Sequence, residues 1–256
     1  MLDYNDEAAV YDSTRGGVPR AEAAAAAVLG LIPPGARSLL DIGCGTGLVT
    51  ERIAAGRPGL RVSGSDAAPG MARVAEQRIG AVVLADARRL PFRDRAVDAV
   101  TAVWLLHLLR EEGDVRAVVA QAARVLRPGG VFVTTVEKDA SHDVGSDIDE
   151  AFAPYLAPTP SDATHRVIEY GAEYGLDVVG SALFRGHGQG RTPMNAISGV
   201  RRGYYASRLE LPGTAAERLV GILTALPGRD RRRAEPEYRL MAFRRRPGSA
   251  DAQRPT

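Results

Sequence analysis

The sequence predicts an α/β fold with a doubly wound, mostly parallel sheet of seven strands. Segments of strand and helix character alternate from about residue 20 to residue 136, which is typical of a parallel sheet covered by helices on both faces. A glycine-rich loop follows the first apolar strand, at the edge where open α/β sheets bind ligands. With 256 residues, of which 45% are apolar, the chain is long enough to form one such domain.

The expected elements of the first half follow one another along the chain. The first helix begins near Pro19, because proline is tolerated in a first turn, and it ends before Pro33. A helix near residues 114–126 carries valines at the spacing of a buried stripe, and a Pro-Gly-Gly turn then leads into a strand at residues 131–136. The other expected strands lie at residues 38–42, 60–65, 81–84 and 97–103, and the helices between them at residues 48–55 and 69–78.

The second half is patterned more loosely. Residues 137–162 look like a loop with a short helix. A helix at residues 162–174, a strand at residues 176–184, two further helices and a last strand at residues 238–244 follow. The polar tail at residues 247–256 is expected to be disordered.

Composition excludes several classes of protein. The formal net charge of +2 neither demands nor excludes a nucleic-acid partner. The single cysteine, Cys44, excludes an internal disulfide and a thiolate metal cluster. No apolar run approaches the roughly 20 residues that span a bilayer, and the acidic start lacks the basic segment of a signal peptide. We therefore expect a cytoplasmic protein that does not enter a membrane.

The glycine loop is the strongest signal in the chain. Gly43, Gly45 and Gly47 let the chain turn sharply after a strand and bring bare backbone against a ligand. The amides that begin the next helix favour anionic or polar groups. Leu48 stands where the dinucleotide-binding fingerprint has its third glycine. The spacing thus disfavours a nicotinamide-dependent oxidoreductase.

Two aspartates flank this loop in the expected fold. Asp41 lies two residues before the first glycine, where a carboxylate can face a cationic amine but would repel a pyrophosphate. Asp66 closes the second strand, where an acceptor for ribose hydroxyls is expected. Together they favour a ligand that has both an amino group and a ribose.

These residues closely resemble motif I and its acidic partner in the class I S-adenosylmethionine-dependent methyltransferases. The nearest group within that family is the bacterial small-molecule group that includes the quinone-biosynthesis enzymes. The resemblance extends over residues 1–136 and is weak beyond them. In one departure, Ala68 stands where the family often has a helix-capping serine, which weakens a cap by about 1 kcal/mol. The further matching segments are Leu84-Ala85-Asp86-Ala87, Asp98-Ala99-Val100 and residues 124–130.

The resemblance implies a Rossmann-like sheet with helical lid elements and S-adenosylmethionine as cofactor. It implies a single domain over residues 1–246, with an N-terminal lid at residues 1–18 and substrate-covering elements at residues 137–215. Tyr4, Ala8, Tyr11 and Arg15 fall on one helical face of that lid by their spacing. The implied cofactor-binding residues are Tyr11, Arg15, Asp41, Gly43, Gly45, Gly47, Asp66, Ala67, Met71, Asp86, Ala87 and Trp104. Of these, Asp86 and Ala87 would contact the adenine, and Trp104 is more often explained by core packing. Tyr11 and Arg15 would lie near the cofactor carboxylate or the acceptor, and an ordinary amphipathic helix is the alternative.

Catalytic residues are harder to predict, because methyl transfer mainly requires alignment of the acceptor and exclusion of water. His107, just past the fourth strand, is the candidate general base, and a structural hydrogen bond is the alternative. The polar residues after the fifth strand could hold a metal ion or a base, but a polar surface loop is favoured, so no metal is expected. These residues are Glu137, Asp139, His142 and Asp143.

The resemblance thus predicts methyl transfer to a small molecule in cofactor or secondary-metabolite biosynthesis, by a monomer or homodimer. Two alternatives stay open, a tRNA-modifying methyltransferase and a protein that binds S-adenosylmethionine without methyl transfer. Nucleic acid is not expected as a partner, because the charge is nearly balanced and the arginine runs near the C-terminus suit a solvated surface. The acceptor atom and its molecule are not encoded in any motif.

Overall fold

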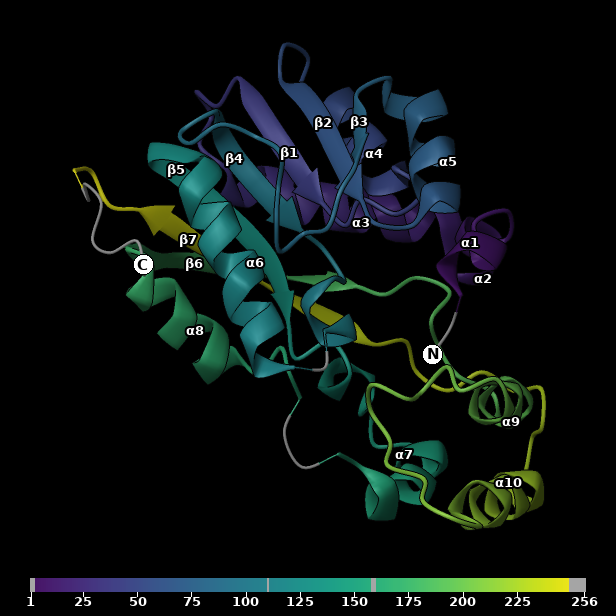
Figure 1. The fold of residues 1–256 in the computed structure, drawn as a ribbon. Coiled ribbons are helices and arrows are strands. Elements are labelled where there is room, and N and C mark those ends of the chain that lie inside the picture. The colour runs from purple at the N-terminus through teal and green to yellow at the C-terminus, as the bar shows by residue number, and fades with distance from the viewer. Residues whose placement is uncertain (1–2, 110, 158–159, 249–256) are drawn as a thin grey trace.

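The computed structural model describes residues 3–109, 111–157 and 160–248, which form a seven-stranded sheet flanked by helices (Figure 1). The sheet order is β3-β2-β1-β4-β5-β7-β6, and β7 alone runs antiparallel to its neighbours. This confirms the predicted doubly wound, mostly parallel sheet. The strands are β1 (Ser38–Ile42), β2 (Arg61–Asp66), β3 (Val82–Leu84), β4 (Val97–Ala102), β5 (Leu126–Val136), β6 (Leu176–Arg185) and β7 (Glu237–Arg245).

Helices cover both faces of the sheet because the central strand is apolar on both sides. Every residue of β1 is buried. Leu40 and Ile42 pack toward the helices of one face, and Leu39 packs toward those of the other. The helices α6 (Glu112–Val125) and α8 (Thr164–Glu173) lie on the first face, and α3 (Gly17–Leu31) and α4 (Leu48–Gly56) on the second, with α5 (Pro69–Ile79) packed beside α4.

The sheet reverses its winding direction between β1 and β4. β1 pairs with β2 on one side and with β4 on the other, so the crossovers after β1 and β4 lead in opposite directions. Such a switch point leaves a crevice at the carboxyl ends of the two strands, where ligands bind. The glycine loop begins there, directly after Ile42.

Most element boundaries agree with the prediction, and β5 shows an instructive difference. The turn expected at residues 127–130 lies inside β5, because Leu126 pairs with Val97 before the register shifts to Val131 opposite Ala99. Gly129 adopts a φ of 78° there. The predicted turn is therefore present as a bulge within a longer strand.

The N-terminal segment differs from the single helical face that the sequence predicts. It forms two short helices, α1 (Tyr4–Glu7) and α2 (Tyr11–Thr14), because a hydrogen bond from the Val10 amide to the Glu7 carbonyl turns the chain between them. The hydroxyls of Ser13 and Thr14 then bond to the Val10 carbonyl. The prediction of one continuous face was wrong, but the segment lies against the sheet edge, and α1 packs on α5.

Three helices form a separate cap beside the sheet: α7 (Asp147–Phe152), α9 (Pro193–Arg201) and α10 (Ala215–Ala225) (Figure 1). Capping boxes at Ser146 and Thr192 start α7 and α9. The expected cover at residues 137–215 also contains α8 and β6, which belong to the sheet layers, and it ends at the first residue of α10. The core of the cap consists of Ile148, Ala151, Phe152, Ala196, Ile197, Val200, Leu209, Leu219 and Leu223.

Short 3₁₀ helices at Leu106–Leu108, Ala140–His142 and Ala153–Tyr155 complete the fold. Over the described residues, every helix is too short or too polar to cross a bilayer. Most of the tail that the sequence predicts to be disordered, residues 249–256, lies outside the described residues.

Candidate cofactor site and the cavity beside it

The glycine loop turns as the sequence predicts. Gly43 and Gly45 adopt φ values of 66° and 57°, a left-handed conformation that glycine adopts readily. A Cβ at Gly43 would lie 2.8 Å from the Leu105 side chain, whereas nothing lies within 4 Å of one at Gly45. The Gly45 amide donates to the Asp66 carboxylate at 2.8 Å. The loop thus presents bare backbone to open space beside an acidic side chain.

A cavity of about 260 Å³, the first cavity, lies at this edge of the sheet. Its lining brings together most of the predicted cofactor-binding residues: Tyr11, Asp41, Gly43, Gly45, Asp66, Ala67, Met71, Ala87 and Trp104. Arg15, Gly47 and Asp86 do not belong to that lining. Gly47 instead begins α4, where a Cβ would lie 3.0 Å from Ala75.

Asp66 is fixed by the backbone around it. Its Oδ2 accepts the Gly45 amide, and its Oδ1 accepts the Ala68 amide at 2.9 Å. Asp66 therefore accepts a hydrogen bond from the Ala68 amide at the start of α5, where the Ala68 side chain cannot form a cap. Burial raises the pKa of Asp66, although these amides oppose the shift. The carboxylate keeps free lone pairs on the cavity side, because each oxygen can accept more than one hydrogen bond.

Asp41 is held from two sides by threonine hydroxyls. The Thr50 hydroxyl donates to Oδ2 at 2.5 Å, and the Thr101 hydroxyl donates to Oδ1 at 2.7 Å. Burial raises the pKa of Asp41 to about 6 in spite of these bonds. A cation next to the carboxylate would offset that burial and favour the ionised form.

Arg20 is a residue of this site that the sequence reasoning missed. It extends from α3 into the first cavity, and its guanidinium carbon lies 4.0 Å from the centroid of the Trp104 ring. Its Nε is buried and has no hydrogen-bond partner among the described residues. A guanidinium group in this state fits a carboxylate ligand. The signal in the sequence was a lone arginine in an alanine-rich helix, but many surface arginines look the same.

Arg15 lines the second cavity described below and not the first. It pairs with Glu7 at 3.5 Å and lies 4.3 Å above the centroid of the Tyr204 ring. Asp86 likewise does not line the first cavity, and Arg88 binds it through Nε at 3.0 Å and Nη2 at 2.6 Å. The side-chain hydrogen bond from Arg88 lowers the pKa of Asp86. Neither side chain lines the first cavity in this conformation.

A second cavity of about 70 Å³ adjoins the first. The two cavities share Tyr4, Tyr11, Arg20, Trp104 and Leu108. The residues that line the second cavity but not the first include Arg15, His107, Lys138, Gln189, Tyr204 and Ser207. Trp104 has a left-handed φ of 58° and Glu137 one of 50°, at the carboxyl ends of β4 and β5. Such strained backbone is common at functional sites.

His107 lines the second cavity from the 3₁₀ helix after β4. Its side chain is buried, and its Nδ1 has no partner among the described residues. Burial, together with the charge of Lys138, lowers the pKa of His107 to about 3. The imidazole is thus neutral at pH 7, and a group of such low pKa is a weak proton acceptor.

Lys138, the only lysine of the chain, is also buried here. Its Nζ pairs with the Asp139 Oδ1 at 2.9 Å, and the Ser207 hydroxyl donates to the Asp139 Oδ2 at 3.0 Å. Burial lowers the pKa of Lys138, but Asp139, Tyr204 and Tyr238 together outweigh the burial, so the pKa is raised. The second cavity therefore contains a permanent positive charge.

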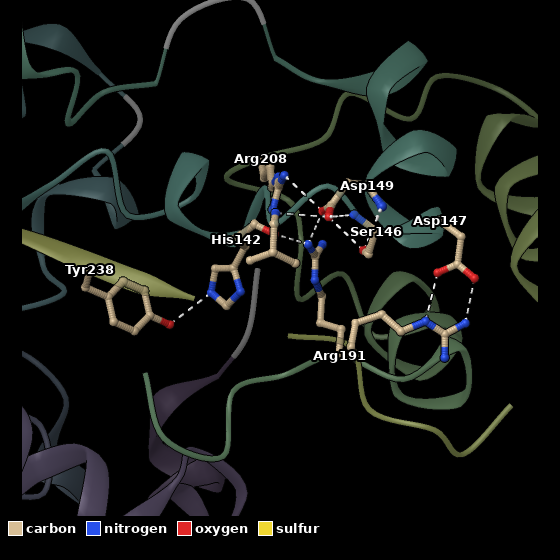
Figure 2. A network of polar contacts seen from close by, with 9 residues as sticks. His142, Ser146, Asp147, Asp149, Arg191, Arg208 and Tyr238 are labelled. Carbon is tan, nitrogen blue, oxygen red and sulfur yellow. Dashed lines mark hydrogen bonds and ion pairs between the residues drawn. The ribbon is translucent and has the colours of Figure 1, made fainter. Parts of the chain in front are cut away.

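The polar residues after β5 do not assemble a metal site. Asp139 pairs with Lys138, and His142 Nε2 lies 3.0 Å from the Tyr238 hydroxyl (Figure 2). Within residues 3–109, 111–157 and 160–248, no group of three or more histidine, cysteine or acidic side chains could hold a metal ion.

The sheet order and the loop at its switch point define the fold of the class I S-adenosylmethionine-dependent methyltransferases. Residues 40–134 match the family model of a methyltransferase domain, and S-adenosylmethionine is the cofactor of that class. The orphaned Arg20, the two aspartates and the bare glycine loop fit the carboxylate, amine and ribose of that cofactor.

Curated relatives match the same part of the chain. The ubiquinone/menaquinone biosynthesis C-methyltransferase of Desulfotalea psychrophila is 36% identical over 101 residues, which cover 38% of this chain and 40% of that protein. The demethylmenaquinone methyltransferase of Thermotoga maritima is 35% identical over 97 residues, or 37% and 41% of the two chains. The malonyl-[acyl-carrier protein] O-methyltransferase of Geobacter sulfurreducens is 32% identical over 140 residues, or 50% and 49%. The chain thus spans about two fifths to one half of the length of these relatives.

Solved structures extend the likeness of fold to nearly the whole chain. The [4+2]-cyclase SpnF superposes with a TM-score of 0.62 at 18% identity and covers 96% of this chain and 94% of its own. The YcgJ protein of Bacillus subtilis superposes with a TM-score of 0.57 at 17% identity and covers 88% and 99%. At such identities these structures show the shared fold alone.

Proposed function

We propose that this protein transfers the methyl group of S-adenosylmethionine to a small molecule bound in the second cavity. The observation that carries this proposal is the shared wall of the two cavities, formed by Arg20, Trp104 and three other residues. A cofactor in the first cavity would therefore have its reacting end beside a ligand in the second. When bound, the cofactor supplies a sulfonium methyl group and a neutral thioether leaving group.

In the first cavity, three charged side chains would each have a matching partner on the cofactor. Asp66 would accept the ribose hydroxyls, and Arg20 would bind the amino-acid carboxylate. Asp41, oriented by its two threonines, would face the amine. Met71 and Ala87 provide apolar wall on the adenosyl side. The chain thereby fixes the donor in orientation, which is the main contribution a protein makes to a displacement reaction.

In the second cavity, positive charge would promote deprotonation of the acceptor. Although burial opposes the effect, Lys138, Arg15 and Arg20 lower the pKa of Tyr204, a phenol that lines the cavity. An acidic O–H, N–H or C–H of the acceptor in the same field would also ionise more easily. The acceptor would give up its proton to solvent and react as its anion, and His107 would hydrogen-bond it through the unpartnered Nδ1.

The identity of the acceptor goes beyond this geometry. The relatives are named for C-methylation and for O-methylation, so they do not select one reacting atom.

The test incubates purified protein with methyl-labelled S-adenosylmethionine and a host extract, and then measures label in the small-molecule, protein and RNA fractions. Label in small molecules is expected. Label in RNA alone would identify a tRNA-modifying enzyme instead. Cofactor binding without label in any fraction, repeated with concentrated extract, would favour a protein that binds the cofactor without methyl transfer.

A further inference from the structure

A third cavity, of about 400 Å³, lies beside the second and shares Arg15, Gln189 and Tyr204 with it. Its lining is basic, because it contains four arginines, and as far as the structure describes it no carboxylate belongs to it. Serine, threonine and asparagine side chains and the glycines of residues 188–190 complete the wall. The arginines are Arg15, Arg191, Arg202 and Arg232.

Arg191 is the buried centre of this group. Its side chain is 7% exposed, and its Nη2 donates to the His142 carbonyl and to the Asp149 carboxylate (Figure 2). Its Nη1 is buried and has no partner among the described residues. A buried donor without an acceptor is costly, so this guanidinium group is poised to accept an anionic partner.

Asp149 is shared with a second buried guanidinium group. Arg208 Nη2 lies 3.9 Å from the same Oδ1 that Arg191 binds (Figure 2). Ser146 also donates to Asp149 through its hydroxyl at 2.7 Å and its amide at 2.9 Å. The one carboxylate is therefore saturated and neutralises only part of the positive charge behind the cavity wall.

The other arginines are also short of counter-charge. Arg202 and Arg15 both pair with Glu7. Arg232 donates to the backbone carbonyls of Gly188 at 3.0 Å and Gly190 at 3.1 Å. In the described part of the chain, the ion pairs of Arg15, Arg191, Arg202 and Arg208 involve two carboxylates, those of Glu7 and Asp149.

We propose that the third cavity binds an anionic group of the methyl acceptor, a phosphate or a carboxylate, while the reacting end of the acceptor lies in the second cavity. This inference rests on the proposed function. Guanidinium groups bind both anions through paired hydrogen bonds, and the shared Arg15, Gln189 and Tyr204 connect the two cavities. The acceptor is thus an elongated acidic molecule, with its charge at the end remote from the transferred methyl group.

The binding test uses Arg232→Gln, because Arg191→Gln would remove the closer of the two buried cations at Asp149 and endanger the fold. Arg231→Gln is the matched control, since Arg231 is the exposed neighbour and does not line the third cavity. Calorimetry titrates pyrophosphate or citrate into each protein saturated with S-adenosylmethionine, so that Arg20 is already occupied. We expect binding of at least one probe, weakened at least tenfold by Arg232→Gln and unchanged by Arg231→Gln.

The preferred probe distinguishes a phosphate from a carboxylate. Absence of binding by both probes, or equal affinity in the two variants, would overturn the inference.

A second measurement separates this inference from the proposed function. The labelled product of the extract experiment is applied to an anion-exchange resin at pH 8, and retention is expected. A labelled but uncharged product would leave the proposed methyl transfer intact and overturn the acidic acceptor. Pyrophosphate binding without labelled product would contradict the methyl transfer and still establish the anion site.

Discussion

The guanidinium group of Arg20 lies against the face of the Trp104 ring, 4.0 Å from its centroid, at the boundary between two cavities. Phe184 and Tyr238 pack edge-on against the same ring at centroid distances of 5.6 Å and 5.5 Å. The aromatic cluster therefore holds Arg20 in place without neutralising it. This arrangement explains how the buried guanidinium group of Arg20 can stay available for a carboxylate ligand.

Replacing Arg20 by glutamine should weaken S-adenosylmethionine binding at least tenfold, because a hydrogen bond to a charged group contributes about 1.5–3 kcal/mol. Calorimetry measures the affinity. Arg73→Gln, which makes the same change at an exposed position of α5, should leave it unaltered. Equal affinity in the Arg20 and Arg73 variants would show that the cofactor carboxylate is bound elsewhere.

Asp66→Ala should also weaken the cofactor by tenfold or more, because the ribose hydroxyls would lose their acceptor. Asp86→Ala should change the affinity less than twofold, since Arg88 already occupies that carboxylate outside the first cavity. Comparison of the two variants distinguishes Asp66 from Asp86, both of which the family resemblance implies to be cofactor-binding. A large loss in the Asp86 variant would mean that Asp86 leaves Arg88 when the cofactor binds.

Cofactor affinity should rise with pH between about 5 and 7. Burial raises the pKa of Asp41 to about 6 from its ordinary value of 3.8. The protonated form is thus favoured in the folded protein at low pH, and it must lose its proton to face a cationic amine. A shift of one pKa unit corresponds to a tenfold change in an equilibrium constant, so a rise of up to about tenfold per unit is expected below pH 6.

Asp41→Asn is the control for this pH dependence. It should bind the cofactor more weakly and with a flatter pH dependence, the remaining slope coming from Asp66. An unchanged slope in the Asn variant would assign the titration to another group.

His107→Gln should slow methyl transfer to the labelled small-molecule fraction while leaving cofactor affinity within twofold of wild type. Because the pKa of His107 is lowered to about 3, the wild-type rate should show no inflection near pH 6.5 that the variant lacks. The pH profile of kcat/KM between pH 5.5 and 8 measures this. An inflection that disappears with the imidazole would restore His107 as the general base.

Lys138→Met should destabilise the fold by about 3–5 kcal/mol, because it leaves the buried Asp139 carboxylate without its cation. Chemical denaturation measures the free energy of unfolding. The double variant Lys138→Met, Asp139→Asn should recover most of that loss, since no uncompensated charge remains. If the double variant is as unstable as the single one, the pair is not what stabilises this region.

The strands and the loop at the switch point could be predicted because their signals are local. The five residues of β1, bounded by a proline-rich turn and a glycine loop, were predicted with the observed limits. The aspartates at the ends of β1 and β2 were likewise placed by their distance from that loop, and the structure brings both into one cavity.

The remainder of the site depends on contacts between distant segments. Arg88 lies two residues from Asp86, but it also binds Asp114 on α6. The ion pair of Arg88 and Asp86 therefore lies outside the first cavity. No role was predicted for Arg20 for a similar reason, because its position depends on Trp104, which packs against Phe184 of β6 and Tyr238 of β7. No periodicity in the sequence encodes such partners.

Glu7 connects the N-terminal segment to the cap. This residue pairs with Arg202 at the end of a cap helix, and the neighbouring Tyr4 and Tyr11 form part of the wall of both the first and second cavities. We infer that exchange of spent cofactor involves movement of a segment that also encloses the proposed acceptor. We expect the two products to leave at linked rates. Breaking of the ion pair between Glu7 and Arg202 would limit both rates.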